Sequence, residues 1–175
     1  MPRRRKHLNP PLLDKLLFGV NLARNEEAPS EIGRGGVRLN PAARLDAFDE
    51  QEFRYTLRRD IAWLLNAVQL GSDHDLSAYP QLEKSVLNYG AVSLIGRSIS
   101  DESIEERGEA IREAIRNFEP RIDPRTLSVK HETVGERVNS VTYVVSGRAR
   151  SADDVIEISF RTDLALDSGA ATVRD

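Results

Sequence analysis

The stretch "IRNFEPRIDPRTLSVKH", from Ile115 to His131, decides the fold, because a helical pattern ends within it and an alternating pattern begins. Its first residues complete an amphipathic segment that runs into Phe118. Pro120 disfavours the helical conformation at the residue before it, so the helix should stop at Phe118 or Glu119. After Pro120 the apolar residues alternate with polar ones, as in a strand that is buried on one face. The stretch therefore predicts a chain of helices first and strands afterwards.

Upstream of this stretch, two longer segments carry helical stripes. In residues 49–70 the spacing predicts a helix that ends before Gly71, with Trp63 and Leu65 widening its apolar face. Its stripe is Phe53, Leu57, Ile61, Leu64 and Val68. A second helix should lead into Phe118, with a capping box formed by Ser103 and Glu106. Its stripe is Ile104, Gly108, Ile111, Ile115 and Phe118.

Between them lies "LSAYPQLEKSVLNYG", residues 76–90. Pro80 suits a first helical turn, and Gly90 suits the residue after a helix. The pattern predicts a short helix whose Leu82, Val86 and Leu87 face inward.

Downstream, the alternating pattern predicts an antiparallel sheet. In residues 139–150 the inward positions are Val141, Tyr143 and Val145, and in residues 154–164 they are Ile156, Ile158, Phe160 and Leu164. Turns are expected at residues 150–154 and 167–169, and "AATV" (170–173) reads as a weak edge strand. The predicted fold class is α+β, with N-terminal helices packed on one face of a C-terminal antiparallel sheet.

The N-terminal quarter has a different texture. Residues 1–20 read as a basic tail and a short amphipathic helix, with Leu12, Leu13, Leu16 and Leu17 on one side. This helix docks either on its own domain or on a partner. Residues 21–47 read as a linker, either functional or disordered. The predicted domains are therefore 1–20, 21–47 and a single α+β domain at 48–175.

Composition limits the classes of function. The 175 residues carry a formal net charge of −3 and no cysteine, which excludes disulfides and thiol catalysis. The sequence predicts no membrane-spanning segment and no signal peptide, so we expect a cytoplasmic protein. The basic tail "RRRK" is the only candidate for nucleic acid or membrane contact, and reads most simply as a solvated tail. We therefore expect no nucleic-acid partner and no membrane insertion.

Catalytic patterns are weak. His7, His74 and His131 lie in unlike contexts without metal-ligand spacing, and no nucleotide-binding motif is present, so no metal and no cofactor is expected. A glycosidase that uses Glu119 as its acid is the enzymatic alternative. Arg121, two residues away, favours the charged carboxylate over the protonated acid that such catalysis needs. The sequence therefore favours a protein that is not an enzyme.

Four motifs in order carry a family resemblance: "LLDKLL" (12–17), "RRDIAWLLNAV" (58–68), "YPQLEKSVLNYG" (79–90) and "AIRNFEPRI" (114–122). With the C-terminal "SFRTDLALDSGAATV" (159–173), they resemble the TssE family, a baseplate subunit of type VI secretion systems related to the phage tail wedge protein labelled lysozyme-like. The resemblance covers the chain from Leu12 onward, apart from the linker. The Glu-Pro-Arg junction and "SVLNYG" are its specific parts.

The resemblance implies a structural role in a cytoplasmic, contractile baseplate. The family binds the wedge subunits TssF and TssG and, through them, TssK, at the base of the sheath formed by TssB and TssC around the spike. Its fold is similar to the strand-exchange domain of sheath subunits. The family's Glu-Pro-Arg motif maps onto Glu119, Pro120 and Arg121, which the resemblance assigns to partner binding, in contact with the wedge core bundle.

Three alternatives stay open. Glu119 and Arg121 form either a partner interface or an internal ion pair between helix and sheet, and both are compatible. "AATV" is either an ordinary edge strand or the place where a sheath strand adds to the sheet. The assembly itself is a secretion system, a phage tail or an extracellular contractile injection particle.

Overall fold

A computed structural model of the chain describes residues 50–92, 101–132, 140–151 and 154–174. The predicted tail and helix at 1–20 and the linker at 21–47 lie outside the described residues. The chain divides into two compact units, residues 1–56 and 57–175. The first is described only from residue 50 to residue 56, the start of helix α3, and the other features below belong to the second.

Helix α3 spans Glu50–Asn66 and confirms the predicted stripe as far as Leu64. It ends earlier than predicted. The Ala67 carbonyl accepts a hydrogen bond from the Ala91 amide at 2.8 Å, and Gln69 donates to the Ala91 carbonyl at 3.1 Å. Pairing with the segment around Ala91 thus replaces the next helical turn, and Val68 is exposed rather than part of the stripe.

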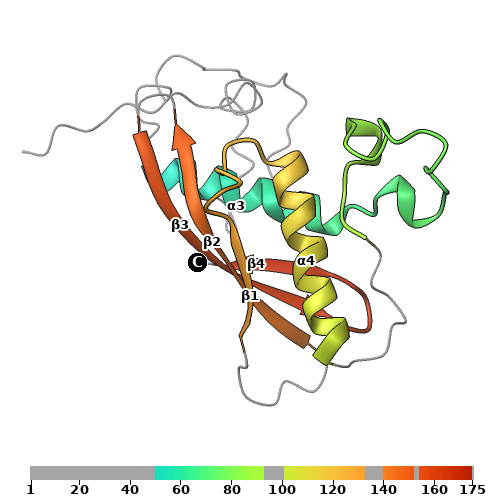
Figure 1. The fold of residues 1–175 in the computed structure, drawn as a ribbon. Helices are drawn as coiled ribbons and strands as arrows, with labels where there is room; N and C mark the ends of the chain where they lie inside the picture. The colour runs from blue at the N-terminus through green and yellow to red at the C-terminus, as the bar shows by residue number, and fades with distance from the viewer. Residues whose placement is uncertain (1–49, 93–100, 133–139, 152–153, 175) are drawn as a thin grey trace, which may run out of the picture. The chain divides into compact units, whose positions relative to one another are not determined.

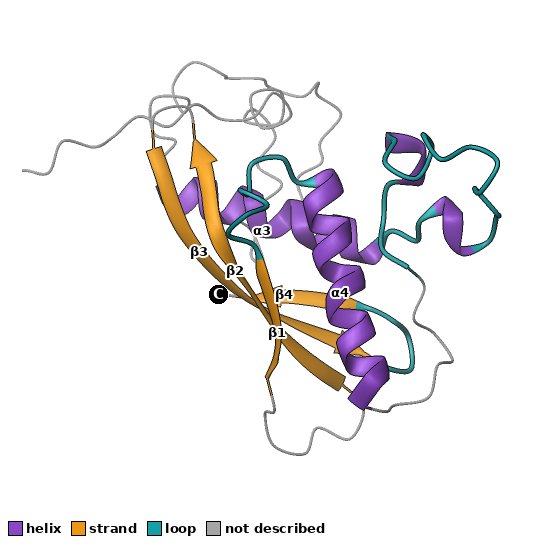
Figure 2. Ribbon diagram, in the orientation of Figure 1, coloured by secondary structure: helices purple, strands orange, loops and turns teal. Residues whose placement is uncertain are grey.

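The predicted helix at 76–90 was wrong. The structure has two short 3-10 turns, η1 (Leu70–Ser72) and η2 (Val86–Asn88), joined by a loop (Figure 2). Val86 and Leu87, predicted to face inward, are 83% and 67% exposed. A chain of three-residue turns replaces the α-helical pattern, with amide–carbonyl bonds from residues 79 to 76, 82 to 79 and 85 to 82.

Helix α4 spans Asp101–Phe118 and ends where Pro120 predicted. It begins at Asp101, and Ser103, the predicted capping residue, lies in its first turn. Its stripe packs on the sheet, and a Cβ added at Gly108 would lie 3.4 Å from the Tyr143 ring. The Tyr143 hydroxyl donates to the Ile104 carbonyl at 2.9 Å, which ties the start of α4 to the sheet.

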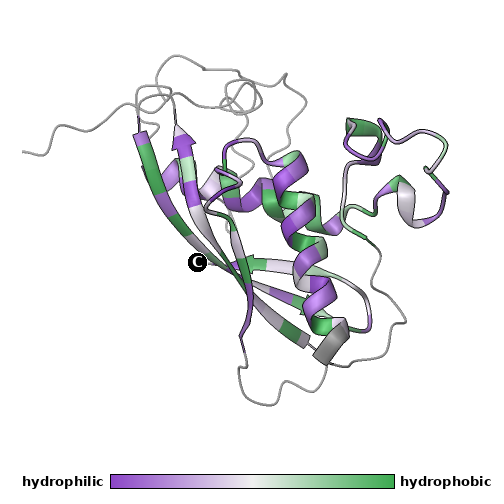
Figure 3. Ribbon diagram, in the orientation of Figure 1, coloured by the Kyte–Doolittle hydropathy of each residue, from purple (hydrophilic) through white to green (hydrophobic). Residues whose placement is uncertain are grey.

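The strands form one antiparallel sheet in the order β1-β2-β3-β4, which confirms the α+β class (Figure 1). Their bounds are Ser128–Glu132 (β1), Ser140–Ser151 (β2), Asp154–Ala165 (β3) and Ala171–Arg174 (β4). The predicted inward positions of β2 and β3 are buried, and hydrophobic and hydrophilic residues alternate along the strands (Figure 3). Among the described residues, no helix has the length and apolar character needed to cross a membrane.

Candidate functional site

The Glu119–Pro120–Arg121 corner joins α4 to the sheet. The Glu119 amide still donates to the Ile115 carbonyl at 2.9 Å, as in the last turn of a helix. Residues 120 and 121 form a turn, and the Arg121 carbonyl accepts from the Arg150 amide of β2 at 2.7 Å. Pro120 is exposed and fixes its own φ near −65°, which suits this abrupt change of direction.

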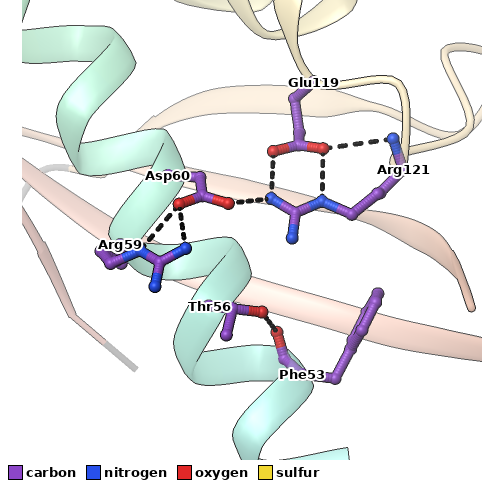
Figure 4. A network of polar contacts seen from close by, with 6 residues as sticks. All are labelled: Phe53, Thr56, Arg59, Asp60, Glu119 and Arg121. Atoms are coloured by element: carbon purple, nitrogen blue, oxygen red, sulfur yellow. Dashed lines mark hydrogen bonds and ion pairs between the residues drawn. The ribbon is translucent and has the colours of Figure 1, made fainter. Parts of the chain in front are cut away.

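The acidic and basic side chains of the corner bind each other. Arg121 Nε donates to Glu119 Oε1 at 2.7 Å, and Arg121 Nη2 donates to Glu119 Oε2 at 2.6 Å (Figure 4). The Arg121 backbone amide also donates to Glu119 Oε1, at 3.2 Å. Two parallel hydrogen bonds between a guanidinium and a carboxylate fix both planes, so the corner is rigid.

This pair continues into α3. Arg121 Nη2 also donates to Asp60 Oδ2 at 2.6 Å, and Asp60 Oδ1 accepts from Arg59 Nε at 2.8 Å. The Arg59 guanidinium carbon lies 4.8 Å from the centre of the Trp63 ring, within cation–π range. Two carboxylates and two guanidiniums thus alternate along one network (Figure 4).

The network is largely shielded from water. The Glu119 side chain is 6% exposed and that of Arg121 is 17% exposed. Burial alone would lower the pKa of the Arg121 guanidinium, but the hydrogen bonds and charges of Glu119 and Asp60 outweigh it and raise that pKa. Arg121 Nη1 is buried and has no hydrogen-bond partner among the described residues.

The structure therefore brings two of the three predicted site residues together. Glu119 and Arg121 face each other and Asp60, which is the geometry of the internal ion pair, and Pro120 is the exposed member. Their assignment to partner binding stays a prediction. Because the network is charge-balanced and buried, contact with a partner would fall on the exposed residues around it.

The sequence did not identify two aromatic residues, Trp63 and Tyr89, that lie at the rim of this network, by which we mean the residues around it. Trp63 was predicted to be in the helical core, which is wrong: it is 51% exposed. At about 100° per residue, it lies roughly 80° to 160° around the helix from the four buried residues of the stripe, which places it outside the stripe. Tyr89 packs its ring edge-on against Phe118 at 5.5 Å. Burial, followed by the nearby carboxylates of Asp60 and Glu119, raises the pKa of Tyr89.

The edge of β4 is partly occupied by a side chain of α3. Asn66 Nδ2 donates to the Ala171 carbonyl at 2.8 Å, and Asn66 Oδ1 accepts from the Ala171 amide at 3.0 Å. Both backbone groups of Ala171 therefore point away from β3. Since backbone groups alternate sides along a strand, those of Thr172 point to β3 and those of Val173 point outward. The predicted edge "AATV" thus offers one free residue among those described.

The longer open edge lies on β3. Strand β4 covers β3 only from Arg161 to Leu164, while β2 pairs with β3 along all twelve residues. By the same alternation, the backbone groups of Val155, Glu157 and Ser159 point away from β2. Among the described residues, no strand pairs with this part of β3. It is the stretch of the described sheet where an incoming strand would find a row of unpaired groups.

The geometry does not favour the glycosidase alternative. Both oxygens of Glu119 are engaged by Arg121. Retaining and inverting glycosidases need a carboxylic acid able to reach the glycosidic oxygen. Within the described part of the chain, no cluster of three His, Cys, Asp or Glu residues could hold a metal ion.

Comparison with known proteins identifies the family of this chain. A family model described as baseplate wedge protein gp25 matches residues 51–154, which is more than half of the chain. The match includes α3, the segment between the helices, α4, the Glu119 corner and the β2 strand. Searches of curated proteins and of solved structures gave no significant match. The chain belongs to the gp25 family of baseplate wedge proteins.

Proposed function

We propose that this chain is the TssE-type subunit of a type VI secretion baseplate, linking the wedge complex to the base of the contractile sheath. The observation that carries the proposal is the Glu119–Pro120–Arg121 corner in a chain of the gp25 family. A structural role fits a site built for rigidity: its charges neutralise one another, and its carboxylates are held by guanidiniums. The wedge partners would be TssF and TssG, with TssK reached through them.

The corner would contact the wedge through its rim. Pro120 and Trp63 are exposed, and Arg59 is held over Trp63 by Asp60. Tryptophan and arginine are frequent energetic anchors of interfaces. Glu119 and Arg121 would act by fixing the position of Asp60 and hence of this rim.

Co-purification tests the wedge contact. The wedge subunits are captured with the wild-type chain, with Trp63→Ala and with Arg121→Ala, and each variant is checked by circular dichroism and thermal melting. Trp63→Ala should stay folded and lose the wedge. If Trp63→Ala and a folded Arg121→Ala both retain the wedge, the corner is a brace alone and the interface proposal fails.

The second contact would be with the sheath. The unpaired edge of β3 at Val155, Glu157 and Ser159 supports addition of a strand from TssB or TssC by β-augmentation. Glu157→Pro removes an outward-pointing amide and leaves the amides that bond to β2 intact, a position where proline is tolerated. It should abolish sheath nucleation, while Glu157→Lys, which keeps the amide, should not. Equal nucleation by both variants would exclude this edge.

The family match also fits a phage tail or an extracellular injection particle. Neighbouring reading frames separate these cases: genes for an effector-secretion apparatus favour the secretion system, and capsid genes favour the phage. A turbidity assay on purified cell wall tests the glycosidase alternative, and we expect no clearing that depends on Glu119.

A further inference from the structure

We propose that the turn Val86–Leu87 is a second docking point for the wedge, and that it inserts into an apolar pocket rimmed by lysine or arginine. This inference rests on the proposed function. It concerns the segment Leu70–Ala91, which we call the display loop, and is independent of the Glu119 corner.

The display loop has a rigid base. Asn88 is buried; its Oδ1 accepts from the Gly71 amide at 2.8 Å, and its Nδ2 donates to the Glu83 carbonyl at 2.9 Å. The Ser85 hydroxyl accepts from the Leu87 amide at 3.2 Å and donates to the Leu82 carbonyl at 3.0 Å. These side-chain hydrogen bonds to the backbone hold the loop in its observed conformation.

Its C-terminal end is fixed by a close backbone approach. Gly90 has φ +141°, and a Cβ at this position would lie 2.5 Å from the Ala67 carbonyl oxygen. The neighbouring Ala91 bonds to Ala67 and Gln69 through its backbone. Tyr89 is held against Phe118 of α4. The base is therefore bound to both helices.

The residues that this base presents are apolar. Val86 and Leu87 are adjacent and exposed, and Tyr79 of the same loop is exposed as well. The turn η2, which carries Val86 and Leu87, has hydrophobic colouring (Figure 3). Apolar residues gathered on a surface mark interaction sites more often than singly scattered ones do.

Charge indicates the chemistry of the partner. The display loop carries three carboxylates, Asp73, Asp75 and Glu83, against one ammonium, Lys84, which gives a formal charge of −2 with His74 neutral. All four charged side chains are exposed. Backbone and side-chain hydrogen bonds from Ser77 lower the pKa of Asp75. An apolar tip with an acidic surround fits an apolar pocket with a basic rim, whose long-range attraction would steer the encounter.

The test measures affinity for the purified wedge subunits by titration of the labelled full chain. The variants are Val86→Ser with Leu87→Ser, Glu83→Lys, and Val68→Ser as the matched control, since Val68 is an exposed apolar residue outside the display loop. We expect at least a 30-fold loss for the double variant and less than a twofold change for the control. Glu83→Lys should weaken binding several-fold and flatten its dependence on salt.

Three results would overturn the inference. The first is wild-type affinity in both the double variant and Glu83→Lys. The second is a concentration-dependent dimer of the wild-type chain that the double variant abolishes, because the turn would then bind another copy. The third is failure of the wild-type chain to bind the wedge, which removes the proposed function and this inference together. The first of these results, found together with loss of binding in Trp63→Ala, rejects this inference and leaves the proposed function standing. If the double variant does not fold, Glu83→Lys carries the test.

Discussion

The two α-helices of the described residues end in opposite ways. Helix α4 ends in a charged corner, where Glu119 and Arg121 are buried against each other and against Asp60. Helix α3 ends in backbone pairing of Ala67 with Ala91, which supports a loop that turns Val86 and Leu87 outward. At the first end polar groups are inside, and at the second apolar groups are outside. At both ends, the residues that hold the backbone in place are not the residues that are exposed to solvent.

The comparison predicts that the corner contributes most to stability. Glu119→Gln leaves the guanidinium of Arg121 buried with one full carboxylate partner, so we expect a loss of about 3 kcal/mol in the free energy of unfolding. Urea denaturation followed by circular dichroism measures it. Glu109→Gln is the matched control, because Glu109 pairs with Arg112 at the surface of the same helix; it should cost less than about 0.5 kcal/mol. Equal losses would show that the buried Glu119–Arg121 pair contributes no more to stability than the exposed Glu109–Arg112 pair.

The base of the display loop should come next. Gly90→Ala forces a side chain into a left-handed backbone and against the Ala67 carbonyl, so we expect a loss of about 2 kcal/mol. Gly71→Ala is the control, since its Cβ would meet the Leu76 side chain at 3.3 Å, which can shift. Thermal melts of the two variants sharpen the comparison. A smaller effect at Gly90 than at Gly71 would contradict the rigid base.

The start of α4 has its own attachment, which depends on pH. Burial raises the pKa of Tyr143 to about 12, from an ordinary value near 10. The folded state therefore binds this proton more tightly than the unfolded chain does. Its contribution is complete below pH 10 and is lost as the pH rises from 10 to 12.

Tyr143→Phe tests this attachment. It removes the hydrogen bond to Ile104 and should cost about 1 kcal/mol at neutral pH. Melting temperatures between pH 9 and 12 should fall less steeply in the variant than in the wild-type chain. Parallel curves would show that Tyr143 does not contribute to the alkaline loss of stability.

The exposed turn should matter least for stability. Val86→Ser with Leu87→Ser removes apolar surface that is already in water, so we expect a change below about 0.5 kcal/mol. The same urea titration measures it. A loss as large as that of Gly90→Ala would mean that these side chains hold the loop and do not merely extend from it.

The sequence predicted most of the fold because most of the fold is periodic. The stripe from Phe53 to Leu64 and the alternation along β2 and β3 both followed from spacing, and Pro120 marked the end of α4. The display loop could not be predicted in this way. Its form depends on Asn88 reaching Gly71, seventeen residues away, and on a backbone approach at Gly90.

The site was predicted in part. Glu119 and Arg121 were named, and their mutual bond was one of two stated alternatives. Asp60, 61 residues from Arg121, carries no local signal of the contact. Trp63 was misplaced because its hydrophobicity was weighed above its angular position on the helix. Tyr89 was embedded in a segment whose structure was wrongly predicted.

The sequence separations within the corner also set an order of folding. Glu119 and Arg121 are two residues apart, so their bond closes a very short loop, whereas the Asp60 contact must close one of 61 residues. We expect the turn at Pro120 to form early and the clamp on α3 to form after the folding transition state. Asp60→Asn should then speed unfolding and leave the refolding rate nearly unchanged in stopped-flow measurements. A slower refolding rate would show that the Asp60–Arg121 contact forms in the folding nucleus. If the refolding rate is unchanged, the contact of α3 with the corner is the last of these contacts to form and the first to break on unfolding.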